Sequence, residues 1–549
     1  MQQSIVVPMP ESTALPRRAV GEWSVRSARA YAEPFIHVWV EASFTAPSGQ
    51  VHTLPGFYDG ENTWRVRFSP DEAGRWLYSI TARPADAGLT QAGEFEVTAR
   101  ETPGFVKATP GTAWGFSYES GATAFLMGDT VYHLFGAAHC GMEVFPFLQR
   151  RAAQGFNILR VRVPVSPFHP PEGYSHWQTR STWPWGGSPQ APQFERFNLA
   201  YFRTVDAVMQ QAAALDIGFE MIMEAWGFEF PFNNRAVFLP EWEELWLRYL
   251  IARYDAFASV YIWTLANEYE FYPDGNCREK YVANRWAMRT ARWVKATAPH
   301  GHVIAAHNGP QEPPFAQRFA LDPQAIDAMM FQEWGTCGAD DGWLAAGIED
   351  KITRAFQAWP GAAVLSEYAY ERNPDLPITF PWFEHTDAEH NRRGAWRGAF
   401  CGLCVINGFE NTWGPVMDLA HDQEGVVYFQ HLRHFFTAVA PFEKLRPASD
   451  LVCPQDVPDG YRARALADAD RRLIVVYFPA GGTATLALAE NATLGECQWY
   501  NPRTGALSEA QPTARTTAGI AFTAPDELDA QGHPTDWVLA LTANHANPR

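Results

Sequence analysis

The first part of the chain alternates apolar and polar residues with the period of a β-strand. Apolar residues occupy every second position of one run: Ile36, Val38, Val40, Ala42 and Phe44. Turn sequences separate such runs, with D-G at 59–60 and E-A-G at 72–74. We therefore expect an antiparallel β-sandwich over residues 1–112.

The pattern changes after residue 112, where short apolar runs alternate with amphipathic stretches. Strands are expected at 125–130, 157–165, 218–226, 261–268, 302–309, 328–335, 362–368 and 404–413. Helices are expected between them, for example at 241–258, 281–297 and 348–359. Eight strands with intervening helices predict an α/β fold, a closed (β/α)₈ barrel over residues 113–440.

Short strands return in the last part of the chain. R-L-I-V-V-Y-F and D-W-V-L-A-L are separated by the turn sequences N-P-R-T-G and P-A-G-G. A second β-sandwich is therefore predicted for residues 441–549.

Charge and composition narrow the ligand classes. The formal net charge of -18 argues against nucleic acid and anionic membrane surfaces as partners. The 22 tryptophans point mildly to sugars, because flat apolar rings with polar edges suit ligands that have C–H faces and hydroxyl rims.

Targeting and cysteine signals are weak. No charged leader with a long apolar core opens the chain and no apolar run approaches 18 residues, so a cytoplasmic location is expected, although a secreted chain trimmed of its leader would look the same. Seven scattered cysteines do not resemble a disulfide framework, and the C-x-x-C spacing of Cys401 and Cys404 lies in an apolar stretch that favours packing.

Two carboxylates stand at the ends of expected barrel strands. Glu268 follows Asn267 at the end of the fourth strand, and Glu367 ends the seventh. The carboxyl ends of barrel strands collect catalytic groups, and a pair of carboxyl groups facing one cleft is what glycosidic cleavage requires. Glu224 and Glu333 also end strands, but a hydrogen-bonded scaffold role is as good an explanation for them.

These residues resemble glycoside hydrolase clan A, the retaining (β/α)₈ glycosidases. The resemblance implies that Glu268 is the general acid/base, Glu367 the nucleophile, and Asn267 a partner of the sugar 2-hydroxyl. In that clan an arginine of the second strand supports the nucleophile. Here both Arg160 and Arg162 fit that position, since they share the same strand face.

More narrowly, L-M-G-D-T on the first strand and A-H-N-G on the fifth resemble the apiosidase-like barrels of bacterial carbohydrate degradation. The stretch from G-F-Y-D-G to G-R-W-L-Y is similar to the small β-sandwich that often precedes such barrels. Q-W-Y-N-P-R-T-G is similar to their C-terminal sandwich, which is sometimes labelled collagen-binding-like.

Further strand-end residues are candidates for sugar contacts. The clan resemblance implies that Trp413 forms a stacking platform, and hydrogen bonding or stacking is also expected from Asp129, His307, Gln332, Trp226 and Trp334. An aromatic loop at 166–194 is expected to wall the pocket, which favours exo action on a short chain or glycoside.

The resemblance to clan A therefore implies a retaining glycosidase that acts on β-D-glycosides or α-L-arabinosides. No metal or cofactor is implied, because metal-ligand spacing and glycine-rich phosphate loops are missing. The alternative is a non-catalytic carbohydrate-binding protein with a degenerate barrel. Homo-oligomerisation is left open.

Overall fold

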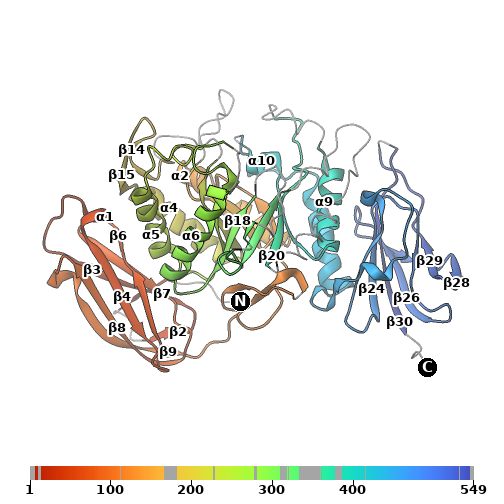
Figure 1. The fold of residues 1–549 in the computed structure, drawn as a ribbon, viewed down its shortest axis with the longest axis horizontal. Helices are drawn as coiled ribbons and strands as arrows, with labels where there is room; N and C mark the ends of the chain where they lie inside the picture. Colours follow the sequence, from red (N-terminus) through yellow and green to blue (C-terminus); the bar gives the residue numbers. More distant parts are fainter. Residues whose placement is uncertain are drawn as a thin grey trace.

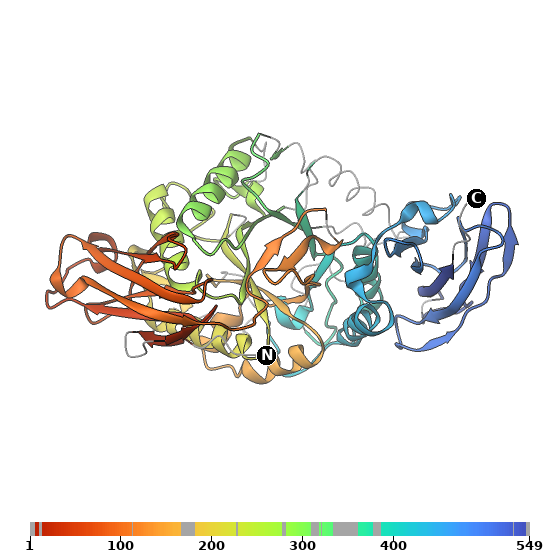
Figure 2. The ribbon, with the colours of Figure 1, turned by 90° about the horizontal axis from the view of Figure 1, so that it is seen from below.

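The computed structural model places three β-rich or α/β units in a row (Figure 1). It describes residues 6–9, 14–111, 113–165, 182–226, 229–276, 281–308, 318–319, 321–332, 359, 361–376, 386–414, 416–530 and 532–544. The barrel lies between the two sandwiches (Figure 1). The view turned by 90° shows the same order, with the sandwiches on opposite sides of the barrel (Figure 2).

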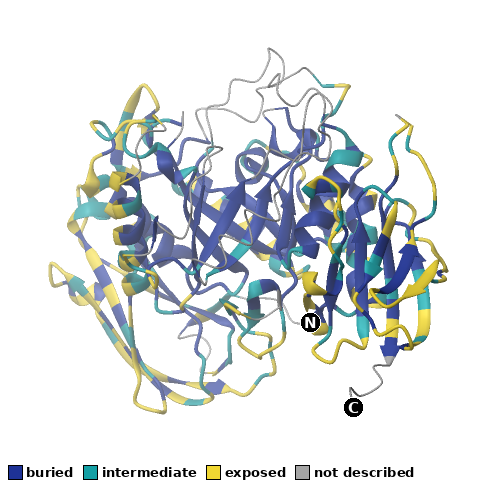
Figure 3. Ribbon diagram, turned by 45° about the vertical axis from the view of Figure 1, so that its right-hand side comes forward, coloured by how far each residue is buried: buried dark blue, intermediate teal, exposed yellow. Residues whose placement is uncertain are grey.

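Eight parallel strands form the closed barrel that the sequence predicts. They are β12 (Met127–Thr130), β13 (Ile158–Arg162), β16 (Gly218–Ala225), β17 (Val260–Asn267), β18 (Val303–His307), β19 (Ala328–Gln332), β20 (Ala362–Glu367) and β21 (Cys404–Asn407). Pairing of β12 with β21 closes the ring. Apart from Ala363, the strand residues are buried, as continuous apolar runs in a helix-covered parallel sheet should be (Figure 3).

Helices cover the outside of the strands. The described α-helices of this unit are α2 (Leu134–His139), α3 (Phe145–Ala153), α4 (Leu199–Ala213), α5 (Pro240–Tyr254), α6 (Tyr281–Thr297), α9 (Ala388–Phe400), α10 (Glu410–Trp413) and α11 (Val426–His434). Local sequence sets their starts: Asn198 caps α4, Asp387 caps α9, and Pro240 occupies the first turn of α5. The helix expected at 348–359 lies outside the described residues, except for residue 359.

Two expectations about the barrel segments are wrong in detail. The eighth strand ends at Asn407 rather than at residue 413, because the chain turns into the short helix α10. The stretch 166–194 is not a loop throughout, since its described part contains the hairpin of β14 (Trp185–Ser188) and β15 (Ala191–Phe197). Residues 166–181 lie outside the described residues.

The N-terminal unit is the predicted sandwich of two sheets. One sheet has the order β1-β3-β7-β6 and the other β2-β9-β8-β4-β5. The strands are β1 (Val6–Met9), β2 (Ala14–Pro16), β3 (Val20–Arg26), β4 (Trp39–Thr45), β5 (Val51–Pro55), β6 (Phe57–Tyr58), β7 (Thr63–Phe68), β8 (Gly74–Arg83) and β9 (Gln91–Thr98). The expected alternating strand begins only at Trp39, because Pro34 starts a short helix, α1 (Pro34–His37).

Buried ion pairs fix this sandwich to the barrel helices. Arg67 of β7 donates to both carboxylate oxygens of Asp206 on α4, at 3.3 and 2.8 Å, and to the backbone oxygen of Arg253 on α5. Arg253 also donates to Asp206 and to Asp59. The unit is therefore docked on the barrel rather than joined by a linker alone. A short hairpin, β10 (Val106–Ala108) with β11 (Phe116–Tyr118), leads into the barrel.

The C-terminal unit is a second sandwich, as predicted. Its sheets have the orders β22-β23-β24-β30-β26-β27 and β25-β29-β28. The strands are β22 (Arg446–Pro447), β23 (Arg464–Ala467), β24 (Leu473–Phe478), β25 (Thr483–Leu486), β26 (Thr493–Tyr500), β27 (Leu507–Glu509), β28 (Ala514–Thr516), β29 (Gly519–Thr523) and β30 (Trp537–Asn544). Short helical turns complete the described elements: η1 (Ala87–Leu89), η2 (Ala113–Gly115), η4 (Tyr269–Phe271), η6 (Phe435–Val439), η7 (Phe442–Lys444), η8 (Ser449–Leu451) and η9 (Asp459–Tyr461).

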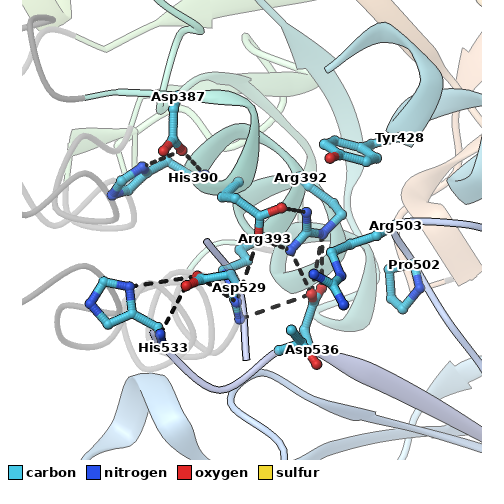
Figure 4. A network of polar contacts seen from close by, with 12 residues as sticks. Asp387, His390, Arg392, Arg393, Tyr428, Pro502, Arg503, Asp529, His533 and Asp536 are labelled. Atoms are coloured by element: carbon cyan, nitrogen blue, oxygen red, sulfur yellow. Dashed lines mark hydrogen bonds and ion pairs between the residues drawn. The ribbon is translucent and has the colours of Figure 1, made fainter. Parts of the chain in front are cut away.

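A polar cluster joins this sandwich to helix α9 (Figure 4). Arg392 of α9 donates to Oδ1 of Asp536 at 2.7 Å, and both side chains are fully buried. Tyr477 of β24 donates to Oδ2 of the same carboxylate at 3.0 Å. We call Arg392, Arg393, Tyr477 and Asp536 the docking cluster. It makes the C-terminal sandwich a fixed neighbour of the barrel.

Candidate active site

The two carboxyl groups singled out in the sequence meet at the carboxyl ends of the strands. Glu268 directly follows β17, the fourth barrel strand, and Glu367 ends β20, the seventh. The amide nitrogen Nε2 of Gln332 lies 3.3 Å from Oε1 of Glu268 and 2.7 Å from Oε2 of Glu367. These two oxygens are therefore at most 6.0 Å apart, the sum of the two distances.

Glu268 sits in an environment that disfavours its charge. Burial is the main cause that raises its pKa to about 8, and repulsion from Glu367 and Glu229 adds to it. Its backbone has the left-handed φ of 52°, and its N–H donates to Nδ1 of His307 at 3.1 Å. The chain thus turns sharply at the end of β17 and is held there by the neighbouring strand β18.

Glu367 has the opposite environment. Burial alone would raise its pKa, but the charge of Arg160, with a smaller contribution from the Tyr132 hydroxyl, outweighs burial and lowers it to about 2. Oε1 accepts hydrogen bonds from Tyr132 at 2.5 Å and from Arg160 at 2.6 Å. The carboxylate is therefore ionised at neutral pH.

His307 is neutral, because burial lowers its pKa well below the ordinary value. Its Nδ1 accepts the N–H of Glu268, so the ring proton lies on Nε2. That nitrogen is 3.3 Å from Oε1 of Glu367. His307 therefore links the two carboxyl residues through the protein rather than through solvent.

The structure separates the two arginines that the sequence left as alternatives. Arg160 contacts Glu367, and its Nη2 donates to Oδ1 of Asn267 at 2.5 Å. Arg162 instead pairs with Glu229 and lies over the ring of Tyr132, with 4.0 Å between its Cζ and the ring centroid. Arg160 is thus the one that supports Glu367. Its bond to Asn267 also fixes that amide, leaving Nδ2 as the end that can donate.

Three of the expected sugar contacts are buried in the scaffold. Asp129 is ion-paired with Arg151 at 2.8 Å and accepts from Thr412, while burial raises its pKa to about 6 despite Arg151. Trp226 is fully buried and donates to Glu224 at 2.9 Å. Trp413 is 3% exposed and lies on α10 rather than on a strand. The structure does not bring the first two to the carboxyl pair.

Trp413 is nearer the site than its small exposure suggests. It forms an apolar cluster with Tyr132, Ile222 and Tyr370, and its ring centroid is 5.2 Å from that of Tyr370. Tyr132 in turn contacts Glu367. A stacking role for Trp413 stays a prediction, as does one for Trp334, which lies outside the described residues.

Sequence reasoning missed several residues around Glu367. Tyr132 follows β12 at the parity of Thr130, and residues two apart face the same side of a strand, so extending the first-strand motif by two residues would have found it. Glu229 lies in a connection without a recognisable motif, and Glu220, which pairs with Arg160 at 3.3 Å, lies mid-strand. Tyr370 follows β20 and hydrogen-bonds Thr130.

Metal and membrane signals are missing from the described part of the chain. Within it, no group of three or more His, Cys, Asp or Glu side chains is arranged to hold a metal ion. No helix among the described residues is long and apolar enough to span a membrane.

Comparisons with known families assign all three units. Residues 114–416, more than half of the chain, match the family described as "Apiosidase-like, catalytic domain". Residues 18–83 match a domain of unknown function, DUF5060, and residues 447–542 match the "Putative collagen-binding domain of a collagenase". None of the curated proteins matches this sequence.

Solved structures share the fold at low sequence identity. A "putative glycoside hydrolase" from Bacteroides vulgatus is 17% identical with a TM-score of 0.71, covering 97% of this chain and 100% of its own. A glycoside hydrolase of family 5 from Bacteroides vulgatus is 15% identical with a TM-score of 0.55, covering 80% of this chain and 93% of its own. The fold is thus that of a glycoside hydrolase.

Proposed function

Because this chain belongs to the apiosidase-like catalytic-domain family, we propose that it is a glycoside hydrolase that acts by double displacement with retention. Glu367 is the nucleophile and Glu268 the general acid/base. The observation that carries the proposal is one pair of strand-end carboxyl groups, joined by one amide, whose environments move their pKa values in opposite directions.

The separation of the two carboxyl groups supports retention. Retaining enzymes hold their carboxyl groups about 5 to 5.5 Å apart, and inverting enzymes about 6.5 to 9.5 Å apart to admit a water. Here the two bridged oxygens are at most 6.0 Å apart. A water between them would have to replace the Gln332 amide.

The protonation states suit the first chemical step. Ionised Glu367 attacks the anomeric carbon while protonated Glu268 gives its proton to the leaving oxygen, so one C–O bond forms as the other breaks. Glu268 is then an anion, and Glu367 is uncharged because its carboxylate has formed an ester with the sugar. In the second step Glu268 takes a proton from water, which attacks the anomeric carbon and releases Glu367.

The substrate class that we propose is a β-D-glycoside or an α-L-arabinoside-type linkage, cleaved from the end of a short chain or glycoside. Support comes from the clan to which the strand-four and strand-seven motifs are similar. The family description adds aryl apiosides to the compounds to test first. The Asn267 amide, fixed by Arg160, is placed to donate to the 2-hydroxyl.

A panel of aryl glycosides tests this function. We expect turnover of at least one member by the wild type, loss of turnover in Glu367→Ala, and rescue of that variant by azide with formation of a glycosyl azide of opposite anomeric configuration. A 2-deoxy-2-fluoro glycoside of the same sugar should add one glycosyl group to Glu367, detected by mass spectrometry. Sugar binding without turnover in the wild type would instead favour the non-catalytic carbohydrate-binding alternative.

The pH dependence gives a second check. Activity requires ionised Glu367, whose pKa is about 2, and protonated Glu268, whose pKa is about 8. The rate constant kcat/KM should therefore stay high through neutral pH and fall as the pH rises past about 8. If kcat/KM of Glu268→Gln still fell as the pH rose past about 8, the general acid would be another residue.

A further inference from the structure

Gln332 has an unusual set of contacts for a buried amide. It ends β19 and is 4% exposed, and its Nε2 serves both carboxyl groups, at 2.7 Å from Glu367 and 3.3 Å from Glu268. A primary amide has two N–H donors, so both are spent on the catalytic pair. Among the described residues, no other side chain has a hydrogen bond to the carboxyl groups of both Glu268 and Glu367, since His307 contacts Glu268 at its backbone N–H.

The orientation of this amide is fixed by charge. Glu367 is ionised, and an amide oxygen turned toward its Oε2 would place two acceptors against each other. Nε2 must therefore face the carboxyl groups, and Oε1 points away from them. That oxygen is buried and has no hydrogen-bond partner among the residues that the structure describes, although buried acceptors are rarely left without one.

Backbone geometry holds the side chain in this position. The pairing of β19 with β20 shifts register between Phe331 and Gln332, which aligns Gln332 with Glu367. Bulges of this kind re-aim a side chain at the end of a strand. The N–H of Gln332 also donates to Oδ1 of Asn308 at 2.8 Å. The residue is therefore built into the barrel rim.

We infer that Gln332 is a positioning residue that holds the two catalytic carboxyl groups in register. The inference deepens the proposed function and rests on it.

The same geometry separates the roles of the two oxygens of Glu367. Oε1 accepts from Tyr132 and Arg160 and lies 3.3 Å from His307, whereas Oε2 has only Gln332 as a partner among the described residues. Oε2 is also the oxygen on the side of Glu268. Oε2 is therefore the attacking atom, and Gln332 aims it.

The experiment compares Gln332→Met with Ser366→Ala. Met keeps the bulk of the side chain and removes both donors and the acceptor. Ser366 donates to the backbone oxygen of Phe331 at 3.2 Å, so its replacement removes a buried hydrogen bond between the same two strands without touching either carboxyl group. We expect kcat/KM to fall about 10- to 100-fold in Gln332→Met and less than about threefold in Ser366→Ala.

The pH profile distinguishes positioning from a general structural role. The amide stabilises the charged form of each carboxyl group, so its loss should move both the acid and the alkaline limbs to higher pH, by about one pH unit. The charged and titratable groups that face the pair stay in place: Arg160, Arg162, Glu220, Glu229, Tyr132, Tyr370 and His307. The positioning role would be overturned if neither limb of the pH profile moved in Gln332→Met, or if Ser366→Ala moved both limbs by the same amount.

These results separate the inference from the proposed function. If the wild type and the azide-rescued Glu367→Ala behave as expected but Gln332→Met shows unmoved limbs, only the inference fails. If no glycoside is turned over, ¹³C titration of the glutamate carboxyl carbons in the wild type and in Gln332→Met still measures the pKa of both residues. Equal titrations in the two proteins would then overturn the positioning role directly.

Discussion

Two regions of this molecule contain the same three kinds of side chain, a carboxylate, an arginine and a tyrosine, but differ in what the carboxylate does. At the barrel rim, Arg160 and Tyr132 donate to Glu367. At the contact between α9 and the C-terminal sandwich, Arg392 donates to Asp536 (Figure 4), and Tyr477 donates to the same carboxylate. In both regions a carboxylate buried among apolar residues stays charged. Burial would raise the pKa of the carboxyl group, but the attraction of the arginine outweighs burial and lowers that pKa.

The difference lies in the second oxygen of each carboxylate. Both oxygens of Asp536 lie within 3.3 Å of Arg392 Nε, and Tyr477 also donates to one of them. In Glu367, Oε1 takes the arginine and the tyrosine, while Oε2 faces Gln332 and the carboxyl group of Glu268. A saturated carboxylate stabilises an interface, and a carboxylate with one lightly held oxygen beside a protonated partner is ready to react.

The largest effect expected from this contrast is on turnover. Glu367→Gln keeps the shape of the side chain but removes the nucleophile, so kcat should fall by roughly 10⁴-fold or more. The melting temperature should fall as well, because the variant breaks the buried ion pair with Arg160, so turnover is compared per folded molecule. Thermal unfolding beside an aryl glycoside assay measures both. If Glu367→Gln lost stability but kept its turnover, the role of Glu367 would be structural, like that of Asp536.

The converse is expected for the docking cluster. Asp536→Asn leaves Arg392 facing an amide, and breaking one side of a buried ion pair should lower the free energy of unfolding by about 3 kcal/mol. Turnover per folded molecule should stay at the wild-type value. Asp387→Asn, in the same region and at the cap of α9, is the matched control, since Asn caps a helix as well as Asp does. Urea unfolding compares the two variants.

The tyrosines sharpen the contrast at a smaller scale. Tyr132→Phe removes a donor to the nucleophile and should lower kcat about 10- to 100-fold, with little change in the free energy of unfolding. Tyr477→Phe removes a donor to Asp536 and should lower the free energy of unfolding by about 1 to 2 kcal/mol, with kcat unchanged. Equal effects of the two variants on kcat would show that the docking cluster acts on the site.

The two clusters were not equally visible in the sequence. The barrel and both sandwiches were predictable, because strand and helix periodicity follows from burial of one or both faces. Glu268 and Glu367 were predictable as strand-end residues. Asp536 was not, since only the docking of α9 against the C-terminal sandwich shows that its carboxylate is buried, and a single Asp beside an apolar strand carries no signal of its partner.

Details of the rim also depend on tertiary structure. Arg160 and Arg162 have the same strand parity, and only the position of Glu229 on the β16 connection separates their roles. Asp129 looked like a sugar ligand because it ends a strand, but its parity turns it toward Arg151 on α3. The end of β21 was placed too far along the chain because α10 is a single turn, too short for helical periodicity to mark where it begins.

The smallest expected effect concerns stability at the rim itself, through Glu268→Gln. A pKa raised from 4.5 to about 8 means that the folded state binds a proton more tightly than the unfolded state, so Glu268 makes folding less favourable as the pH rises between these values. Gln removes this titration. Its stability gain should be near zero at about pH 4.5 and about 1 kcal/mol at pH 7, allowing for the partial exposure of the side chain. Asp536→Asn should show no such gain at any pH in this range, because its partner lowers the pKa instead. Unfolding free energies measured from pH 4.5 to pH 8 test both slopes, and a gain in Glu268→Gln that did not grow with pH would mean that the acid is not held protonated by its surroundings.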